Sequence, residues 1–235
     1  MIKSQQRKMH KWEPHSYQEN GVEWVLEGFA QEGCSALFLD PGLGKTTITL
    51  EVFRQLKAQG KAKRMLVLAP LRVVQMAWPS ELRKWLNFMD LRYVVVHGPY
   101  KEKLLKQDAD IYLINYEAIP WLVEQKWSGA DMLVFDELSK MKSWSSKRVK
   151  DLKPFLPSFK YRLGLTGTPM TNGLEDLFAQ VYMLDLGKRL GSRITHFRNK
   201  YFLPQSKYGF KLEPIPGAPQ LVFNKLEDLA FKIKA

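Results

Sequence analysis

The sequence has little cysteine, no long apolar run and no secretory leader, and each deficit excludes a class of protein. Cys34 is the single cysteine among 235 residues, so the chain forms no internal disulfide, which fits a reducing compartment. No run of about 18 apolar residues occurs, as a membrane-spanning helix would need. The N-terminal stretch from Met1 to Lys11 is basic and polar, unlike a secretory signal. We therefore expect a cytoplasmic protein that is not secreted and has no membrane partner.

Acidic residues are also scarce, and the net charge is +12. Such an excess favours a polyanionic partner through the release of condensed counterions, although it also serves solubility. From Gly187 to Leu212 the sequence has no Asp or Glu. The basic residues concentrate in two stretches, namely Lys188, Arg189, Arg193, Arg198, Lys200, Lys207 and Lys211, and Lys140, Lys142, Lys147, Arg148, Lys150 and Lys153.

Short apolar runs alternate with longer amphipathic segments, which is typical of a doubly wound α/β fold with strands buried on both faces. The expected strands are Ala36–Leu39, Met65–Ala69, Tyr93–Val96, Ile111–Ile114, Met132–Phe135 and Arg162–Leu165. The expected helices are Ser16–Gln31, Lys45–Ala58, Leu71–Leu86, Tyr100–Lys106, Glu117–Val123, Gly173–Leu184, Ser192–Tyr201 and Asn224–Ile233. The stretch from Pro204 to Pro219, rich in proline and glycine, predicts an extended loop.

A glycine-rich segment from Gly42 to Thr47 follows the first expected strand and opens a helix. In this context glycines let backbone N–H groups approach phosphate oxygens, and the helix N-terminus adds positive potential. Lys45 would reach the β and γ phosphates of a nucleotide, and the Thr46 hydroxyl would bind Mg²⁺. The distal glycine of the full phosphate-loop pattern falls at Leu39. The alternative is a glycine turn that merely caps a helix.

Two adjacent carboxylates, Asp136 and Glu137, end the expected strand Met132–Phe135. In an α/β sheet this position lies beside the phosphate loop. Asp136 would hold Mg²⁺ through water, and Glu137 would orient the attacking water in phosphoryl transfer. The alternative is a pair that only caps the next helix.

With these motifs in order, the chain resembles the superfamily 2 helicases and, within them, the Snf2-like ATPases of phages and bacteria. The remaining motifs that carry the resemblance are Trp12, Pro14, His15, Tyr17, Gln18, Gly21, Val22 and Trp24; Ala69–Arg72 with Trp78, Glu81 and Leu82; Ile114–Glu117; Asp136–Lys140; and Leu165–Pro169 with Asn172, followed by Phe197–Phe202. Ser139 stands where many relatives carry histidine, so the route by which hydrolysis couples to movement is open.

The resemblance implies a RecA-like P-loop domain with a mostly parallel central sheet flanked by helices. Residues 1–186 would form the ATP-binding lobe, and residues 187–235 a basic helical segment, a Pro/Gly loop and a terminal helix on the same lobe. ATP and Mg²⁺ are the implied cofactors. The residues implied to bind nucleotide are Tyr17, Gln18, Pro41, Gly42, Leu43, Gly44, Lys45, Thr46 and Thr47, with Thr46 and Asp136 at the metal and Lys45, Asp136 and Glu137 in catalysis.

The resemblance also implies a nucleic-acid track, most simply duplex DNA held without strong sequence preference. Four residues at strand ends are the candidates, namely Pro70, Arg72, Asn115 and Tyr116. Arg72 is equally well a surface arginine, and Tyr116 equally well a core residue. Thr166, Gly167 and Thr168 would couple the ATP site to the track. A threonine hydroxyl of this motif would donate a hydrogen bond to Glu137 or Asp136. The tryptophans are expected in the core or against a partner.

Motors of this family place ATP between two RecA-like lobes, and this sequence is predicted to supply only the N-terminal one. The second lobe would come from a full-length protein or act in trans, and it would bring the arginines that speed phosphoryl transfer by about 10³–10⁵. The first hypothesis is therefore the ATP-hydrolysing lobe of a DNA translocase or helicase, weak in isolation. The alternative is a non-catalytic module that binds nucleic acid or a partner and uses ATP as a structural ligand.

Overall fold

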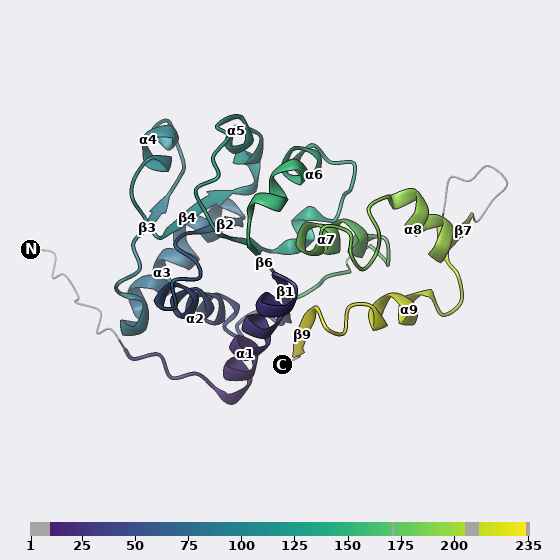
Figure 1. Ribbon diagram of the computed structural model, residues 1–235, viewed down its shortest axis with the longest axis horizontal. Coiled ribbons are helices and arrows are strands. Elements are labelled where there is room, and N and C mark those ends of the chain that lie inside the picture. Colours follow the sequence, from purple (N-terminus) through teal and green to yellow (C-terminus); the bar gives the residue numbers. More distant parts are fainter. Residues whose placement is uncertain (1–9, 171, 205–211, 234–235) are drawn as a thin grey trace, which may run out of the picture.

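The computed structural model describes residues 10–170, 172–204 and 212–233, which fold around a parallel β-sheet (Figure 1). Seven strands lie in the order β3-β4-β2-β5-β6-β1-β9, and every neighbouring pair is parallel. The strands are β1 (Cys34–Leu39), β2 (Met65–Ala69), β3 (Tyr93–Val95), β4 (Ile111–Asn115), β5 (Met132–Asp136), β6 (Tyr161–Thr166) and β9 (Ala230–Ile233). The expected α/β fold with a parallel central sheet is confirmed.

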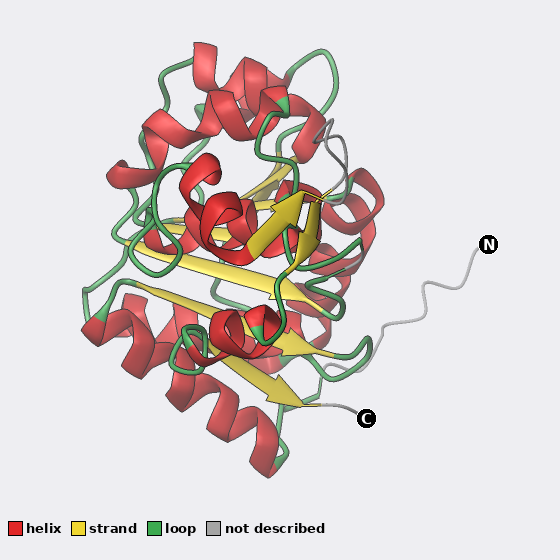
Figure 2. Ribbon diagram, turned by 90° about the vertical axis from the view of Figure 1, so that its right-hand side faces the viewer, coloured by secondary structure: helices red, strands yellow, loops and turns green. Residues whose placement is uncertain are grey.

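Helices cover both faces of this sheet (Figure 2). Alternate residues of β2 belong to two separate buried clusters, with Val67 on one face and Leu66 on the other. The cluster that contains Val67 includes residues of α1 (Ser16–Gln31), α2 (Lys45–Ala58) and α3 (Trp78–Lys84). The cluster that contains Leu66 includes residues of α4 (Lys101–Leu105), α5 (Ile119–Glu124), α6 (Lys147–Leu152), α7 (Asp176–Asp185), α8 (Ile194–Tyr201) and α9 (Ala218–Asn224).

The register of the sheet brings the ends of its central strands together. Phe38 of β1 pairs with Thr166 of β6, and Asp136 of β5 pairs with Leu165 of β6. Because parallel strands all end at the same edge, the loops after β1, β2, β4, β5 and β6 converge there. The glycine-rich segment, the acidic pair, Ala69–Arg72, Ile114–Glu117 and Leu165–Pro169 all lie at this edge.

The predicted helices Ser16–Gln31 and Lys45–Ala58 and the predicted strand Met65–Ala69 have the same bounds in the structure. The other predicted strands differ by at most two residues at either end. Continuous apolar runs between turn residues leave little choice of register, which explains this agreement.

The predicted terminal helix is wrong. The segment from Asn224 to Ile233 holds the end of α9, turns, and then the strand β9, which runs parallel to β1. Leu226 and Leu229 mimic a helical period, but β1 presents an unpaired strand edge on this side. Its backbone groups need partners, and the Ala36 N–H donates to the Leu229 carbonyl at 2.8 Å.

The predicted helix Leu71–Leu86 is present over residues 71–84, but it is not α-helical throughout. Residues Val73–Ala77 form a π-helical turn, α3 then runs from Trp78 to Lys84, and Trp85 has an extended conformation. Pro79 lacks an N–H and its ring clashes with the carbonyl of the preceding turn, so the helix widens just ahead of it.

The expected loop from Pro204 to Pro219 contains more structure than its composition indicated. Strands β7 (Phe202–Pro204) and β8 (Leu212–Pro214) pair antiparallel, and α9 begins at Ala218. Helix α6 lies in the second basic stretch, where no helix was predicted. Proline and charge patterns predict turns and exposure, whereas tertiary packing selects short elements such as these.

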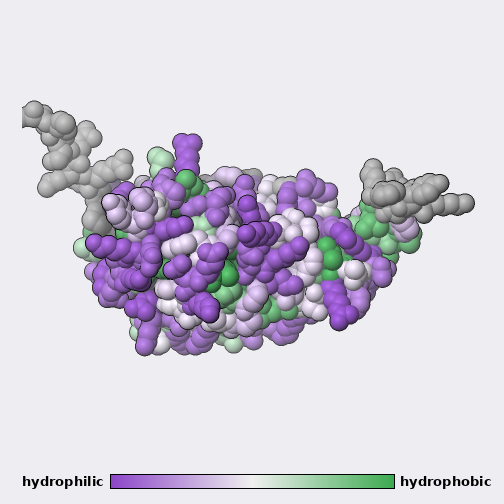
Figure 3. Space-filling view, turned by 90° about the horizontal axis from the view of Figure 1, so that it is seen from above, coloured by the Kyte–Doolittle hydropathy of each residue, from purple (hydrophilic) through white to green (hydrophobic). Residues whose placement is uncertain are grey.

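Within the part of the chain that the structure describes, no helix has both the length and the apolar character required to cross a bilayer. Figure 3 shows the face above α4 to α7, which is mainly hydrophilic with small hydrophobic patches. Larger hydrophobic patches appear towards the end that carries α8 and β7, where Leu203 is 59% exposed.

Candidate nucleotide site at the carboxyl edge of the sheet

The loop between β1 and α2 leaves the first turn of α2 open to an anion. Gly42 and Gly44 have φ values of 87° and 78°, which residues with a side chain rarely adopt. Gly44 caps α2 without a side-chain hydrogen bond. A Cβ atom at Gly44 would lie 2.3 Å from Nε2 of Gln18 and 2.9 Å from Oγ1 of Thr47, so a larger residue would displace these side chains as well as strain the backbone. The N–H groups of this helix end are therefore available to phosphate oxygens.

Lys45 lies across this loop. Its Nζ donates to the carbonyls of Leu39 at 2.7 Å and Asp40 at 3.1 Å. Burial lowers the pKa of Lys45, while the charges of Asp136, Glu137 and Asp40 oppose that shift. An ammonium group held by backbone carbonyls beside carboxylates is suited to exchange those carbonyls for phosphate oxygens.

The carboxylate of Asp136 is held by an aromatic side chain that was expected in the core or against a partner. Trp78, the first residue of α3, is 0% exposed, and its Nε1–H donates to Oδ2 of Asp136 at 2.7 Å. Burial raises the pKa of Asp136, and the hydrogen bond from Trp78 opposes that rise. The sequence offered one indication of this contact, a tryptophan six residues after Arg72. The direction of its side chain could not be predicted, because it depends on the π-helical turn.

Glu137 is oriented by two hydroxyl groups. Its Oε1 accepts hydrogen bonds from Oγ1 of Thr166 at 2.9 Å and from Oγ of Ser139. The N–H of Thr168 donates to Oγ1 of Thr166 at 3.1 Å, which fixes the direction of that hydroxyl. The predicted contact between the Thr-Gly-Thr motif and the acidic pair is thus present, and Ser139 joins it from the position where many relatives carry histidine.

The backbone of Glu137 is left-handed, with φ 68° and ψ 65°, an unfavourable conformation for a residue with a side chain. A second buried aromatic residue stabilises it. The Tyr116 hydroxyl donates to the carbonyls of Asp136 at 3.0 Å and Glu137 at 3.3 Å. Tyr116 is 1% exposed, and burial raises its pKa well above the usual value. Of its two interpretations, the core residue is therefore correct, and its side chain is no surface contact.

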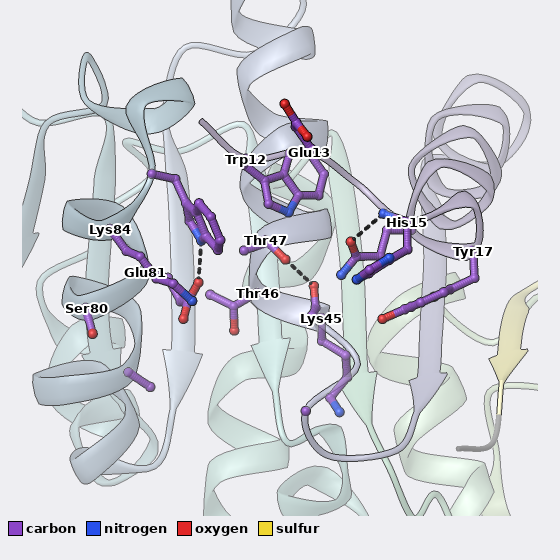
Figure 4. A pocket seen from close by; sticks show the side chains of 15 residues that line it. Trp12, Glu13, His15, Tyr17, Lys45, Thr46, Thr47, Ser80, Glu81 and Lys84 are labelled. Carbon is purple, nitrogen blue, oxygen red and sulfur yellow. Dashed lines mark hydrogen bonds between the residues drawn. The ribbon is translucent and has the colours of Figure 1, made fainter. Parts of the chain in front are cut away.

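A cleft of about 560 Å³ opens between the phosphate loop, the segment before α1, and α3. Figure 4 shows Lys45, Thr46 and Thr47 in the middle, His15 and Tyr17 on one side, and Ser80, Glu81 and Lys84 on the other. The cleft is partly polar and partly apolar, which suits a nucleotide.

Gln18 connects the N-terminal wall of the cleft to the phosphate loop. Its Oε1 accepts the His15 N–H at 3.0 Å, and its Nε2 lies 3.5 Å from the Leu43 carbonyl. The rings of His15 and Tyr17 stack at 5.7 Å between centroids. Tyr17 and Gln18, which were implied to bind nucleotide, thus lie beside the phosphate loop, although Gln18 is 6% exposed and its amide is already engaged.

The opposite wall of the cleft was largely missed in the sequence. Trp85 donates its Nε1–H to Oε2 of Glu81 at 2.7 Å, and Nζ of Lys84 lies 4.2 Å from the Trp85 ring. Glu81 and Trp85 are four residues apart, a spacing that places them on the same face of a helix. That spacing was the only indication in the sequence that the two side chains meet. No local pattern shows that their helix faces the phosphate loop.

The other predicted site residues also lie at this edge. Pro70 follows β2, Arg72 is exposed, and Asn115 is 7% exposed with its Nδ2 donating to Glu117 at 2.9 Å. Pro41 is exposed in the phosphate loop, and a Cβ atom on Gly167 would lie 3.4 Å from its Cδ. The Thr-Gly-Thr motif therefore packs against the phosphate loop.

Part of the basic excess is engaged by side chains of the same chain. Arg189 pairs with Asp228 at 2.7 Å and with Asp185 at 3.5 Å, and Arg198 pairs with Glu175 at 2.6 Å. Lys188 pairs with Glu32, Nζ of Lys153 lies 3.8 Å from the Trp144 ring, and Lys207 and Lys211 lie outside the described residues. The charge run therefore overstates the surface that is available to a polyanion.

The fold and these contacts define a class of protein, the P-loop α/β domains with an acidic pair on a neighbouring strand. A family model described as the SNF2-related domain matches residues 17–213. The protein p41 of Acyrthosiphon pisum secondary endosymbiont phage 1 is 32% identical over 210 residues, which cover 83% of this chain and 45% of that protein. Chromodomain-helicase-DNA-binding protein 9 of Mus musculus is 26% identical over 188 residues, 72% of this chain and 6% of that protein.

A solved structure is similar over nearly all of the chain. The Sulfolobus solfataricus SWI2/SNF2 ATPase core in complex with dsDNA has a TM-score of 0.80 and 27% identity, covering 97% of this chain and 46% of that chain. The chain thus spans less than half the length of these relatives. It belongs to the SNF2-related domain family, which confirms the Snf2-like resemblance and the RecA-like fold.

Proposed function

We propose that this chain binds and hydrolyses ATP as the N-terminal RecA-like lobe of a Snf2-type translocase or helicase that acts on duplex DNA. One observation carries the proposal. Lys45 at the phosphate loop and Glu137, held by Thr166, lie at the ends of strands β1, β5 and β6, which are neighbours in one sheet. A nucleotide bound at the loop would therefore present its terminal phosphate to a carboxylate that is already oriented.

The described residues suit a magnesium nucleotide. Mg²⁺ prefers one or two protein oxygens, with waters and phosphates completing its shell. The Thr46 hydroxyl and the Asp136 carboxylate supply such a set, and the part of the chain that the structure describes contains no cluster of three or more His, Cys, Asp or Glu that would instead form an all-protein cage. Bound Mg²⁺ would neutralise the phosphate oxygens during transfer.

Glu137 is the residue proposed to orient the attacking water. Both hydroxyl donors bind its Oε1, which supports Oε2 as the oxygen proposed to face the water. Thr166 connects this carboxylate to the loop that packs on Pro41, so a movement of the loop changes the direction of Oε2. A module that used ATP only as a structural ligand would need neither this clamp nor the carboxylate, which favours hydrolysis over the non-catalytic alternative.

The track is proposed to lie along the same edge. Pro70 and Arg72 follow β2, and Asn115 ends β4. Helix starts and polar groups at such positions bind phosphates without reading bases. The net charge of +12 supports a polyanionic partner, and the Sulfolobus relative is described in complex with dsDNA. We therefore expect duplex binding that weakens steeply with salt and depends little on sequence.

Rapid turnover is proposed to need a second RecA-like lobe, within a longer protein or in trans. Among the described residues that line the cleft there is no arginine to stabilise charge on the transferring phosphoryl group. The chain on its own, with saturating duplex DNA, should therefore hydrolyse ATP far more slowly than about 1 s⁻¹, a typical low value for enzymes. A rate at or above that value would overturn the need for a second lobe.

The proposed function is tested with Glu137→Gln. The amide keeps the shape of the side chain but removes the charge that orients the water, so single-turnover hydrolysis should fall about 10²–10³-fold while ATP affinity changes little. Glu124→Gln, on the exposed end of α5, is the matched control. If the wild-type chain binds ATP and Glu137→Gln hydrolyses it equally fast, the assignment of Glu137 fails. If hydrolysis is undetectable in both while ATP still binds, the non-catalytic alternative stands.

A further inference from the structure

Trp78 connects a predicted nucleic-acid segment to the acidic pair. The chain leaves β2 at Ala69, passes Pro70 and Arg72, and makes the π-helical turn before it reaches Trp78. The side chain is fully buried, and the indole has one polar group, an N–H that can only donate. That group bonds to Asp136 at 2.7 Å. A rigid ring therefore joins the segment after β2 directly to a carboxylate proposed at the metal.

Tyr116 makes the equivalent connection from β4. It follows Asn115, the last residue of that strand, and its hydroxyl bonds the carbonyls of both Asp136 and Glu137. The guanidinium of Arg148, from α6, lies 5.9 Å from the centre of its ring. The two predicted nucleic-acid segments thus each send one buried aromatic donor to the acidic pair, one to a side chain and one to the backbone.

We propose that Trp78 and Tyr116 are positioning residues that couple nucleic-acid binding to the geometry of Asp136 and Glu137. The inference rests on the proposed function. A duplex that binds Arg72 or Asn115 shifts the segment after β2 or β4, and the rigid rings transfer that shift to the acidic pair. Burial favours this route because, away from water, no solvent replaces a broken hydrogen bond. The π-helical turn ahead of Trp78 supplies a place where the helix can adjust.

The test measures the thermodynamic coupling between the two ligands. The affinity for ATP is determined with excess Mg²⁺ and again with EDTA, each with and without a short duplex DNA. In the wild-type chain the duplex should raise the Mg²⁺–ATP affinity by a factor of about 5–150, the usual range of coupling between sites. Trp78→Phe and Tyr116→Phe keep the rings and remove the donors. Each should lower this factor about fivefold towards 1.

Two variants serve as matched controls. Tyr112→Phe removes a buried hydroxyl from the same strand, β4, but that hydroxyl donates to Gln107 at 2.7 Å, away from the acidic pair. Trp127→Phe removes an indole that packs edge-on against Tyr112. Both should keep the wild-type coupling factor. ATP affinity in EDTA and DNA affinity without nucleotide should stay unchanged in Trp78→Phe and Tyr116→Phe, which a merely structural role would not predict.

The outcomes separate this inference from the proposed function. If the wild-type chain binds ATP and duplex but the factor is 1, or if both phenylalanine variants keep it, the positioning role is overturned. If the wild-type chain binds neither ligand, the proposed function itself fails. Should Trp78→Phe not fold, Tyr116→Phe decides, because the residue it introduces is no larger and loses one hydroxyl.

Discussion

Helices α2 and α3 both follow central strands of the sheet, but they contribute to the site in different ways. Helix α2 begins after the glycine loop that follows β1, at the left-handed Gly44, and offers backbone N–H groups and Lys45. Helix α3 begins only after the π-helical turn and offers a buried side chain, Trp78, that reaches Asp136. Two helices that each follow a strand of the sheet therefore contribute differently, one with a glycine-capped N-terminus proposed to bind an anion and the other with a side chain that holds a carboxylate.

The difference comes from the turn that opens each helix. A glycine loop exposes the helix end to a ligand, whereas the widened turn ahead of Pro79 rotates the next residues towards the sheet. The local sequence of α2 suffices for its role, because the loop and the lysine are adjacent in the chain. The role of α3 depends on a partner 58 residues away in sequence.

The largest effect on ligand binding is expected from Lys45→Ala, which removes the charged group that α2 contributes to the site. Loss of a charge-assisted contact costs about 1.5–3 kcal/mol, so ATP affinity should fall about 10–100-fold. Calorimetric titration measures the affinity, and thermal unfolding checks that the fold survives. Lys57→Ala, at the far end of the same helix, controls for the loss of a lysine. Unchanged affinity in Lys45→Ala would show that the phosphate loop is wrongly assigned.

A smaller effect is expected from Gly44→Ala. The new Cβ would meet Gln18 and Thr47, so these side chains and the loop must shift, and ATP affinity should fall about tenfold. The unfavourable φ would also lower the stability of the fold. Gly60→Ala is the matched control, because Gly60 has φ 67° but a Cβ atom there would meet no other atom within 4 Å. Both variants lose stability, and only Gly44→Ala loses affinity. Equal affinities in the two would mean that the tight packing at Gly44 does not matter for binding.

The smallest effect is expected from Arg72→Ala, at the start of the segment that leads to α3. Removing one phosphate contact should weaken duplex binding a few-fold and reduce the slope of affinity against salt by about one. Arg189→Ala, whose guanidinium is paired with Asp228 and Asp185, should lower stability instead and leave the salt slope unchanged. Salt titrations of duplex binding distinguish the two. The reverse result would place the track on the C-terminal segment.

Sequence reasoning predicted the site best where chemistry and chain order coincide. The phosphate loop, the acidic pair and the Thr166 contact to Glu137 were all expected, because each motif follows a strand and strand ends meet at one edge. Trp78 and Trp85 were expected in the core or against a partner, since a tryptophan in a helix carries no local sign of where its N–H points. Tyr116 was undecided between core and surface for the same reason.

The sequence by itself determined the first six strands of the sheet, the glycine-rich loop and the pair of carboxylates, because these depend on neighbouring residues and on the period of apolar side chains. Only the tertiary structure decided that the last segment is strand β9, that the basic residues Arg189 and Arg198 are paired, and that Trp78 and Tyr116 meet at the acidic pair. Each of these depends on groups far apart in the chain, whose backbone and charged atoms must find partners when water is removed.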